Sequence, residues 1–429
     1  MGLGKTVQAS VAIKELFDAH SIRRVLIVCP LSLARNWRRE LNTWAGGFPV
    51  VMYEGADRYG MLSGNAPILV GSYETVAADL RSATSDGQLF CDIGVDLIVL
   101  DEAQRIKDPD STRSRVLGRV VSARRWAISG TPLENHPREL SSLLRFLFPN
   151  EFSEKEALDD LSLMLAKRDS SMVRRTKDEV GLQLPSRTTD YVPIALTPDQ
   201  AAEYDRALFE VQQAVLASPS RSELAARLLS GLQKLRRIAA ISANGCSAKL
   251  DYIEEEAEEL RDCGEKLIVF SSFPNLALRE VSKRLARFGP VLFTGDMSQD
   301  ERQSAHERFL NDPECGVMCA SLRAAGVGVT WTVARYVYHL DLWWNPQVLR
   351  QAEDRVHRIG QVQPVFLKRL VAERTIDEGV ALLLERKDAL FRRVVDDEDI
   401  GTATDLPIEY LLGLIGLRPQ EITGADRPE

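Results

Sequence analysis

Residues 351–361 have the sequence Gln-Ala-Glu-Asp-Arg-Val-His-Arg-Ile-Gly-Gln. The two arginines, Arg355 and Arg358, are three residues apart, and a helix would direct both side chains to one face. Guanidinium groups are planar and permanently charged, so they suit a phosphate whose negative charge spreads as it is transferred. The alternative is an amphipathic surface helix whose charges are solvated. The choice depends on whether the chain also carries a phosphate-binding element.

Such an element stands at the other end of the chain, where residues 1–6 read Met-Gly-Leu-Gly-Lys-Thr. A helix that follows this loop would offer backbone N–H groups to phosphate oxygens, with Lys5 as a point charge and the Thr6 hydroxyl on magnesium. The complete loop has the pattern Gly-x4-Gly-Lys-Thr. With Gly4 as its second glycine and Gly2 inside it, the leading part and the preceding strand would fall before residue 1. We therefore expect the true start to lie upstream.

An acidic pair follows the apolar run Val95–Leu100, which is typical of a parallel strand buried on both faces. The pair therefore lies at the carboxyl edge of a sheet, where α/β proteins bind ligands. Asp101 can hold magnesium through water, and Glu102 is placed to polarise an attacking water. The amide of Gln104, which follows the pair, can both donate and accept hydrogen bonds. Many strands end in Asp, so the pair gains weight only from its spacing to Lys5.

The composition describes an ordinary globular protein of more than one domain. The chain has 429 residues, of which 45% are hydrophobic and 27% charged. A net charge of −8 is unlike that of a DNA-coating protein, although local basic patches matter more than the sum. The six cysteines have no zinc-site spacing, which favours a reducing compartment. No apolar run reaches the roughly 20 residues of a membrane span. We expect a cytoplasmic protein, and the excess of arginine over lysine suggests a bacterial source.

Two series of alternating strands and helices are separated by a stretch with helical periodicity. The first series has strands predicted at Arg24–Cys29, Ile68–Ser72, Val95–Leu100 and Arg124–Ser129. The second has strands predicted at Lys266–Phe270, Val291–Thr294, Val317–Ala320, Tyr336–Leu340 and Val365–Leu370. Between them, helices are predicted at Leu158–Leu165, Pro198–Leu216 and Ser222–Ile241. This pattern predicts two α/β domains with a helical insertion.

Four motifs occur in the order that superfamily-two helicase-like ATPases use: residues 1–6, Asp101-Glu102-Ala103-Gln104, Ser129-Gly130-Thr131-Pro132 and residues 351–361. More narrowly, the chain resembles the SWI/SNF-type DNA-translocating ATPases, from residue 1 to about Leu384. The arginine motif ending in His-Arg-Ile-Gly-Gln is specific for that branch, whereas Gly-Lys-Thr alone would not be.

The resemblance implies an α/β fold with two RecA-like lobes, each a parallel sheet flanked by helices, and a helical insertion between them. We expect a first lobe over 1–150 that lacks its N-terminal part, and a helical protrusion or linker over 151–245. A second lobe is expected over 246–395, and a C-terminal tail over 396–429.

The resemblance also implies roles for individual residues. Catalysis is expected from Asp101, Glu102, Gln351, Arg355 and Arg358, and magnesium binding from Thr6 and Asp101. Nucleotide binding is expected at Gly2, Gly4, Lys5, Thr6, Gln104 and Gly328. Coupling to nucleic acid is expected at Ser32, Ser72, Thr131, Arg174, Ser271 and Arg323. Arg174 lies in a basic run that also suits a solvated surface. The family usually has Asn-Leu-Thr where this chain has Thr330-Trp331-Thr332, which bears on how that segment is coupled.

The implied function is ATP-dependent and magnesium-dependent translocation on duplex DNA that displaces or remodels bound protein, for example RNA polymerase. A monomer in the bacterial cytoplasm, associated with the nucleoid, would fit. Two alternatives stay open: a helicase that separates strands or acts on RNA, and an inert module that binds DNA or a partner because the N-terminal nucleotide-binding segment is absent. The nucleic acid that stimulates hydrolysis, and the sequence encoded upstream of Met1, would distinguish them.

Overall fold

A computed structural model describes residues 3–63, 66–81, 94–129, 137–152, 160–173, 175, 184–325, 328–393 and 407–418. The chain divides into two compact units, and the main division falls between Leu182 and Gln183. Each unit has its own parallel sheet and its own hydrophobic core. Among the described helices, none is long and apolar enough to cross a membrane.

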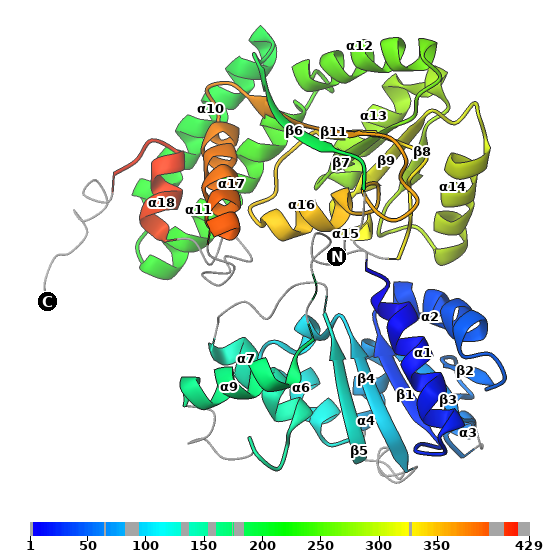
Figure 1. Ribbon diagram of the computed structural model, residues 1–429. Helices are drawn as coiled ribbons and strands as arrows, with labels where there is room; N and C mark the ends of the chain where they lie inside the picture. The colour runs from blue at the N-terminus through cyan, green and yellow to red at the C-terminus, as the bar shows by residue number, and fades with distance from the viewer. Residues whose placement is uncertain are drawn as a thin grey trace, which may run out of the picture. The chain divides into compact units, whose positions relative to one another are not determined.

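The sheet of the first unit has five strands in the order β2-β3-β1-β4-β5, and every pairing is parallel (Figure 1, blue to cyan). The strands are β1 (Val25–Cys29), β2 (Val50–Tyr53), β3 (Ile68–Ser72), β4 (Val95–Asp101) and β5 (Ser122–Ile128). All residues of β1 and β3 are buried, as expected of central strands covered on both faces. This arrangement brings the carboxyl ends of β1, β3 and β4 to one edge of the sheet.

Helices cover both faces of the first sheet because alternate strand residues point to opposite sides. One face packs against α4 (Tyr73–Arg81), α6 (Thr112–Gly118) and α7 (Pro137–Leu147) through a core that contains Leu26, Val28 and Phe146. The helices α1 (Lys5–Asp18) and α2 (Leu31–Trp44) contact each other, and α2 also contacts β2 and β3. The shorter elements are α3 (Arg58–Ser63), the 3-10 turn Ala103–Ile106 and α9 (Leu161–Ser171).

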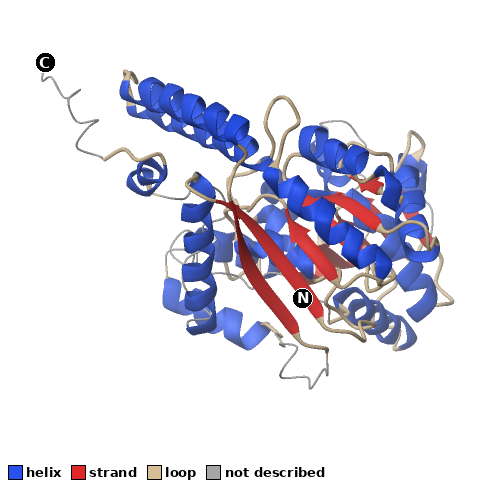
Figure 2. Cartoon of the chain, turned by 90° about the horizontal axis from the view of Figure 1, so that it is seen from above, coloured by secondary structure: helices blue, strands red, loops and turns tan. Residues whose placement is uncertain are grey.

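The sheet of the second unit has six strands in the order β6-β11-β10-β7-β9-β8, again with parallel pairings (Figure 1, green to orange). The strands are β6 (Arg187–Ile194), β7 (Leu267–Ser271), β8 (Val291–Phe293), β9 (Val317–Ser321), β10 (Tyr336–His339) and β11 (Val365–Ala372). Strand β7 sends Ile268 and Phe270 into one core and Leu267 and Val269 into another. In Figure 2 the red strands run between blue helices.

The region 151–245, expected to be helical, contains a strand that the sequence analysis did not predict. Strand β6 pairs along its whole length with β11 at the edge of the second sheet. Its first four residues are exposed and polar, and it includes Pro193, which an edge strand tolerates. The usual signal of a buried apolar run is therefore absent. Helices α10 (Pro198–Leu216) and α11 (Arg221–Ala240) follow it and pack into the second unit's core.

The remaining helices complete the second unit. They are α12 (Ala248–Asp262), α13 (Arg279–Arg284), α14 (Gln299–Asn311), α15 (Leu322–Ala325), α16 (Pro346–Glu353), α17 (Ile376–Arg393) and α18 (Ile408–Leu414). A π-helical turn over Pro274–Leu278 precedes α13, and a 3-10 turn over Ala286–Phe288 follows it. Buried residues of α18 join the same core as α10, α11 and α17, which gives this C-terminal helix a packing role.

Candidate nucleotide site and arginine segment

The phosphate-binding end of the first unit is the start of α1. Gly4 precedes the helix in the left-handed region at φ 71°, which glycine adopts without strain. Lys5 and Thr6 occupy the first turn, whose backbone N–H groups have no partner within the helix. The Gln8 side chain donates to the Leu3 carbonyl at 2.7 Å and so links the first turn of the helix to the residue before Gly4. This geometry fits a phosphate group. Gly2, also predicted to bind nucleotide, lies outside the described residues.

Asp101 ends β4 with both carboxylate oxygens engaged. The Trp37 indole donates to one oxygen at 2.8 Å, and the Glu102 backbone N–H donates to the other at 3.0 Å. The side chain is only 4% exposed, and this burial raises the pKa of Asp101 to about 6. The charge of Glu102 raises it further, while the Trp37 hydrogen bond and the charge of Lys5 oppose the shift.

The immediate surroundings of Asp101 fit a magnesium ion that is shared with a substrate. Magnesium is usually held by one or two carboxylates together with substrate phosphates. Within the described ranges, no group of three or more His, Cys, Asp or Glu side chains could hold a metal ion. A fixed carboxylate at the sheet edge and the hydroxyl of Thr6 in the α1 turn are the donors that such a site requires.

Glu102 adopts an unusual backbone conformation and has a defined side-chain partner. Its φ and ψ are both 54°, in the left-handed region that non-glycine residues rarely occupy. The Gln104 amide nitrogen donates to the Glu102 carboxylate, and the Gln104 amide oxygen accepts from the Ser129 hydroxyl at 2.9 Å. Gln104 thus links the acidic pair to the end of β5, where the Ser-Gly-Thr-Pro motif begins. Thr131 of that motif lies outside the described residues.

Two further predicted positions in the first unit lie at helix starts. Ser32 is a half-buried residue in the first turn of α2. Ser72 is buried, and its hydroxyl accepts from the Thr75 backbone N–H at 3.0 Å, which caps α4. The neighbouring Glu74 forms ion pairs with two arginines, Arg105 and Arg113. The Ser72 side chain therefore shapes this turn. Arg174 is outside the described residues.

The arginine segment differs from the prediction of one helical face. Helix α16, capped by the Asn345 side chain, ends at Glu353, so Arg355 and Arg358 fall in the turns that follow. The Arg355 carbonyl accepts from the Trp331 backbone N–H at 2.8 Å, which replaces a bond within the helix. The Arg358 guanidinium donates to the Thr330 hydroxyl at 2.9 Å. Arg355 and Arg358 are thus hydrogen-bonded to residues 331 and 330, and they do not lie together on one helix.

A buried acid, Glu353, anchors this segment to three strands. Its carboxylate lies 3.0 Å from Arg369 on β11, 3.2 Å from His339 on β10 and 3.7 Å from Arg187 on β6. Burial favours the neutral acid, but the charge of Arg369, the contact with His339 and the charge of Arg187 hold the pKa of Glu353 well below its usual range. The sequence analysis did not single out Glu353, because a buried helix acid has the same local signature as a solvated one. Gln351, two residues earlier, is half-buried in α16.

The remaining predicted positions of the second unit surround a second buried network. Ser271 is fully buried, and its hydroxyl donates to Asp341, which also forms a 3.1 Å ion pair with Arg236 of α11. Arg236 lies 5.1 Å from the Trp343 ring centre, and the exposed Arg323 lies 5.6 Å from the same ring. Gly328 has φ 70° and gives the chain its turn. The buried Ser271 hydroxyl therefore contacts other residues of the protein, whereas the Arg323 side chain is exposed to solvent.

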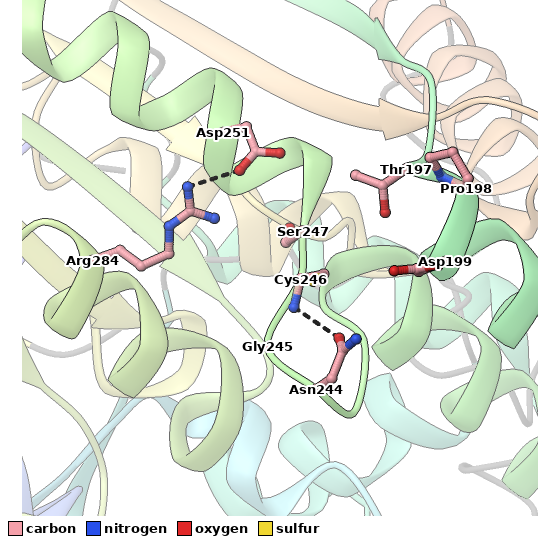
Figure 3. Close-up of a pocket in the computed structure, with 9 residues that line it drawn as sticks. All are labelled: Thr197, Pro198, Asp199, Asn244, Gly245, Cys246, Ser247, Asp251 and Arg284. Atoms are coloured by element: carbon pink, nitrogen blue, oxygen red, sulfur yellow. Dashed lines mark hydrogen bonds and ion pairs between the residues drawn. The ribbon is translucent and has the colours of Figure 1, made fainter.

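A separate cavity of about 360 Å³ lies in the second unit and contains none of the predicted site residues. Figure 3 shows the Arg284 side chain turned toward Asp251, at 2.7 Å, across one side of it. The lining residues are Thr197, Pro198, Asp199, Asn244, Gly245, Cys246, Ser247, Asp251 and Arg284. Arg284 also pairs with Glu254 of α12 at 2.6 Å, and the Ser247 hydroxyl donates to the Ala240 carbonyl at 2.6 Å. Nothing in the lining indicates a ligand class.

The first unit has a Lys-Thr helix start and an acidic pair beside a parallel sheet. The second unit is an α/β unit with two arginines after a helix. Together these features define a helicase-type nucleoside triphosphatase. Comparison with family models agrees. The SNF2-related domain matches residues 1–242, and the helicase conserved C-terminal domain matches residues 248–360. The chain belongs to the SNF2-related family of ATP-dependent helicases and translocases.

Individual relatives are similar along nearly the whole chain. A Mycoplasma genitalium ATP-dependent helicase is 30% identical over 96% of this chain and 41% of its own length. A putative ATP-dependent helicase/translocase of Bacillus subtilis is 29% identical over 93% of this chain and 46% of its own length. The Sulfolobus solfataricus SWI2/SNF2 ATPase core in complex with dsDNA is 28% identical, covering 97% of this chain and 91% of that chain, with a TM-score of 0.45. The chain thus spans less than half the length of the curated relatives.

Proposed function

We propose that this chain is a DNA-stimulated ATPase that translocates on duplex DNA and remodels or displaces bound protein. The observation that carries the proposal is the Gln104 side chain, which joins Glu102 to Ser129. A residue that must orient water needs a fixed carboxylate, and this bond supplies the fixation. The bond also connects that carboxylate to a motif expected to respond to nucleic acid. Hydrolysis and DNA contact would share one hydrogen-bonded path.

In this proposal the first unit binds the nucleotide. Gly2, Gly4 and Lys5 hold the phosphates, and Thr6 and Asp101 hold magnesium, which when bound neutralises phosphate charge. Glu102 accepts a proton from the attacking water. The raised pKa of Asp101 fits this role, because a cation would replace the proton that the buried carboxyl otherwise takes up.

The second unit supplies positive charge to the transferred phosphate. Arg355 and Arg358 stabilise its developing charge, a contribution that in related chemistry reaches roughly 10³–10⁵ in rate. Gln351 orients the reacting groups, and the turn at Gly328 allows close approach of the backbone. The Glu353 ion pairs hold the arginine segment against its sheet during each cycle.

Contacts to duplex DNA involve phosphates, so the protein reads no particular sequence. Arg174 and Arg323 are proposed to contact phosphates directly, and Ser32 and Thr131 to contribute hydroxyl or backbone donors. Ser72 and Ser271 shape their turns from within. DNA affinity should fall with salt as phosphate contacts release counterions. We further propose a monomer associated with the bacterial nucleoid, with a DNA-bound complex such as RNA polymerase as its target.

Steady-state ATP hydrolysis tests the proposal, with duplex DNA, single-stranded DNA or RNA added in turn. A version extended upstream of residue 1 is measured in parallel. Stimulation by duplex DNA without strand separation supports a translocase, and a triplex-displacement assay then shows movement. Stimulation by single strands together with unwinding would favour a strand-separating helicase. If neither version hydrolyses ATP with any nucleic acid, the proposal fails and a binding module takes its place.

A further inference from the structure

Three sets of hydrogen bonds join the loop before β10 to the arginine segment that follows α16. The Thr330 side chain accepts from Arg358, the Trp331 backbone N–H donates to the Arg355 carbonyl, and the Gln361 amide donates to the carbonyls of Thr332 and Ala334 at 3.2 and 3.0 Å. Residues 330–334 and residues 355–361, two irregular stretches of chain, therefore form one hydrogen-bonded unit. Neither stretch has a regular secondary structure that would otherwise fix it.

The Trp331 side chain anchors this hydrogen-bonded unit in the hydrophobic core. Its side chain is fully buried and packs edge-on against Phe293, with 5.2 Å between ring centres. Phe270 lies beside it at 6.2 Å, and the indole N–H donates to the His306 ring at 3.1 Å. A large ring wedged between two strands and a helix cannot shift without disturbing the core. The backbone of Thr330, one residue earlier, is held in the same place.

The Arg358 guanidinium is hydrogen-bonded to this position. A guanidinium on a long flexible stem loses considerable rotamer freedom when it must point in one direction. Besides the 2.9 Å bond to the Thr330 hydroxyl, Arg358 has a longer 3.4 Å contact to the Val329 carbonyl. The Thr330 hydroxyl is the closer acceptor of the two, and it sits on a backbone that Trp331 fixes.

We propose that Thr330 is a positioning residue for Arg358, with buried Trp331 as the anchor that keeps it in place. The inference rests on the proposed function, because it takes Arg358 as a group that acts on the transferred phosphate.

The test compares variants of nearly equal volume in the protein. Thr330→Val removes the acceptor, Thr330→Ser keeps it, and Thr330→Asn carries the residue usual in the family. Thr332→Val is the matched control, because within the described residues the Thr332 hydroxyl makes no hydrogen bond. We expect Thr330→Val to lower kcat about ten- to a hundredfold, as for a lost bond to a charged group, with KM for ATP unchanged. Thr330→Ser and Thr330→Asn should stay within about threefold of the parent, as should Thr332→Val.

A second readout avoids turnover. The affinity for ADP–fluoroaluminate, which mimics the transferred phosphate, should fall with kcat in Thr330→Val, while the affinity for ADP stays constant. In the Arg358→Ala background Thr330→Val should have no further effect on either quantity. Equal melting temperatures of Thr330→Val and Thr332→Val show that the fold is intact.

The outcomes separate the two proposals. If Arg358→Ala slows hydrolysis but Thr330→Val does not, the positioning role is wrong and the proposed function stands. An undiminished effect of Thr330→Val in the Arg358→Ala background also overturns it. If Arg358→Ala leaves hydrolysis unchanged, or the parent does not hydrolyse ATP, the arginine role fails and the inference fails with it.

Discussion

Asp101 in the first unit and Glu353 in the second are both almost completely buried carboxylates beside the predicted site, yet they are held by different partners. Asp101 accepts from a neutral indole and a backbone N–H, and its pKa is raised to about 6. Glu353 is surrounded by Arg369, His339 and Arg187, and its pKa is held below the usual range. The first carboxyl can exchange a proton for a metal ion. The second is a permanent charge that fixes the arginine segment.

A change from glutamate to glutamine should affect activity in the first unit and stability in the second. Glu102→Gln should reduce ATP hydrolysis about 100- to 10,000-fold, because the water loses its proton acceptor. The substituted amide can still accept from Gln104, so the free energy of unfolding should change by no more than about 0.5 kcal/mol. Steady-state kinetics and urea denaturation measure the two effects. Binding of fluorescent duplex DNA serves as the control, and its loss would contradict a role limited to water activation.

Glu353→Gln should act on stability instead. It leaves the buried charge of Arg369 without its carboxylate, which costs about 3–5 kcal/mol of unfolding free energy. Glu373→Gln, at an exposed position on the same unit, is the matched control and should be neutral. The pKa of Glu353 in the folded protein lies below the ordinary glutamate value of 4.5. The ion pairs therefore stabilise fully above about pH 4.5 and lose this effect as the pH falls through the folded pKa. A Glu353→Gln variant as stable as Glu373→Gln would show that the network carries little energy.

Asp101 should make activity depend on pH where Glu353 does not. Because its pKa is raised to about 6, the free carboxyl is neutral below that value and cannot hold magnesium. At limiting magnesium, ATP hydrolysis should fall roughly tenfold per pH unit below about 6. Higher magnesium should move the inflection to lower pH, because the cation competes with the proton. A pH–rate profile at two magnesium concentrations checks this. If the pH of the inflection does not change with magnesium concentration, the titrating group is not Asp101.

The same contrast explains how much of the molecule could be predicted from its sequence. The strand Val95–Leu100 and the acidic pair after it are a local pattern, and the structure has β4 over Val95–Asp101. The partners that fix the arginine segment are distant in sequence: Glu353 bonds Arg187 and Arg369, and Trp331 bonds Arg355. No local spacing encodes such pairs. Strand β6 escaped prediction for a related reason, since an exposed edge strand lacks an apolar run.

The Gln104 link gives the smallest expected effect and tests how the first unit differs from the second. Gln104→Met keeps the side-chain volume but removes both the donor to Glu102 and the acceptor for Ser129. Loss of one or two neutral hydrogen bonds should lower kcat about five- to tenfold, with KM for ATP little changed. Ser129→Ala should reproduce part of the effect, and the double variant should be no slower than Gln104→Met, because both changes break one path. Gln104→His, which carries the residue frequent in the family, should retain most activity. Additive losses in the double variant would mean that Ser129 and Gln104 act separately, and that the acidic pair, unlike the arginine segment, is held without help from a neighbouring motif.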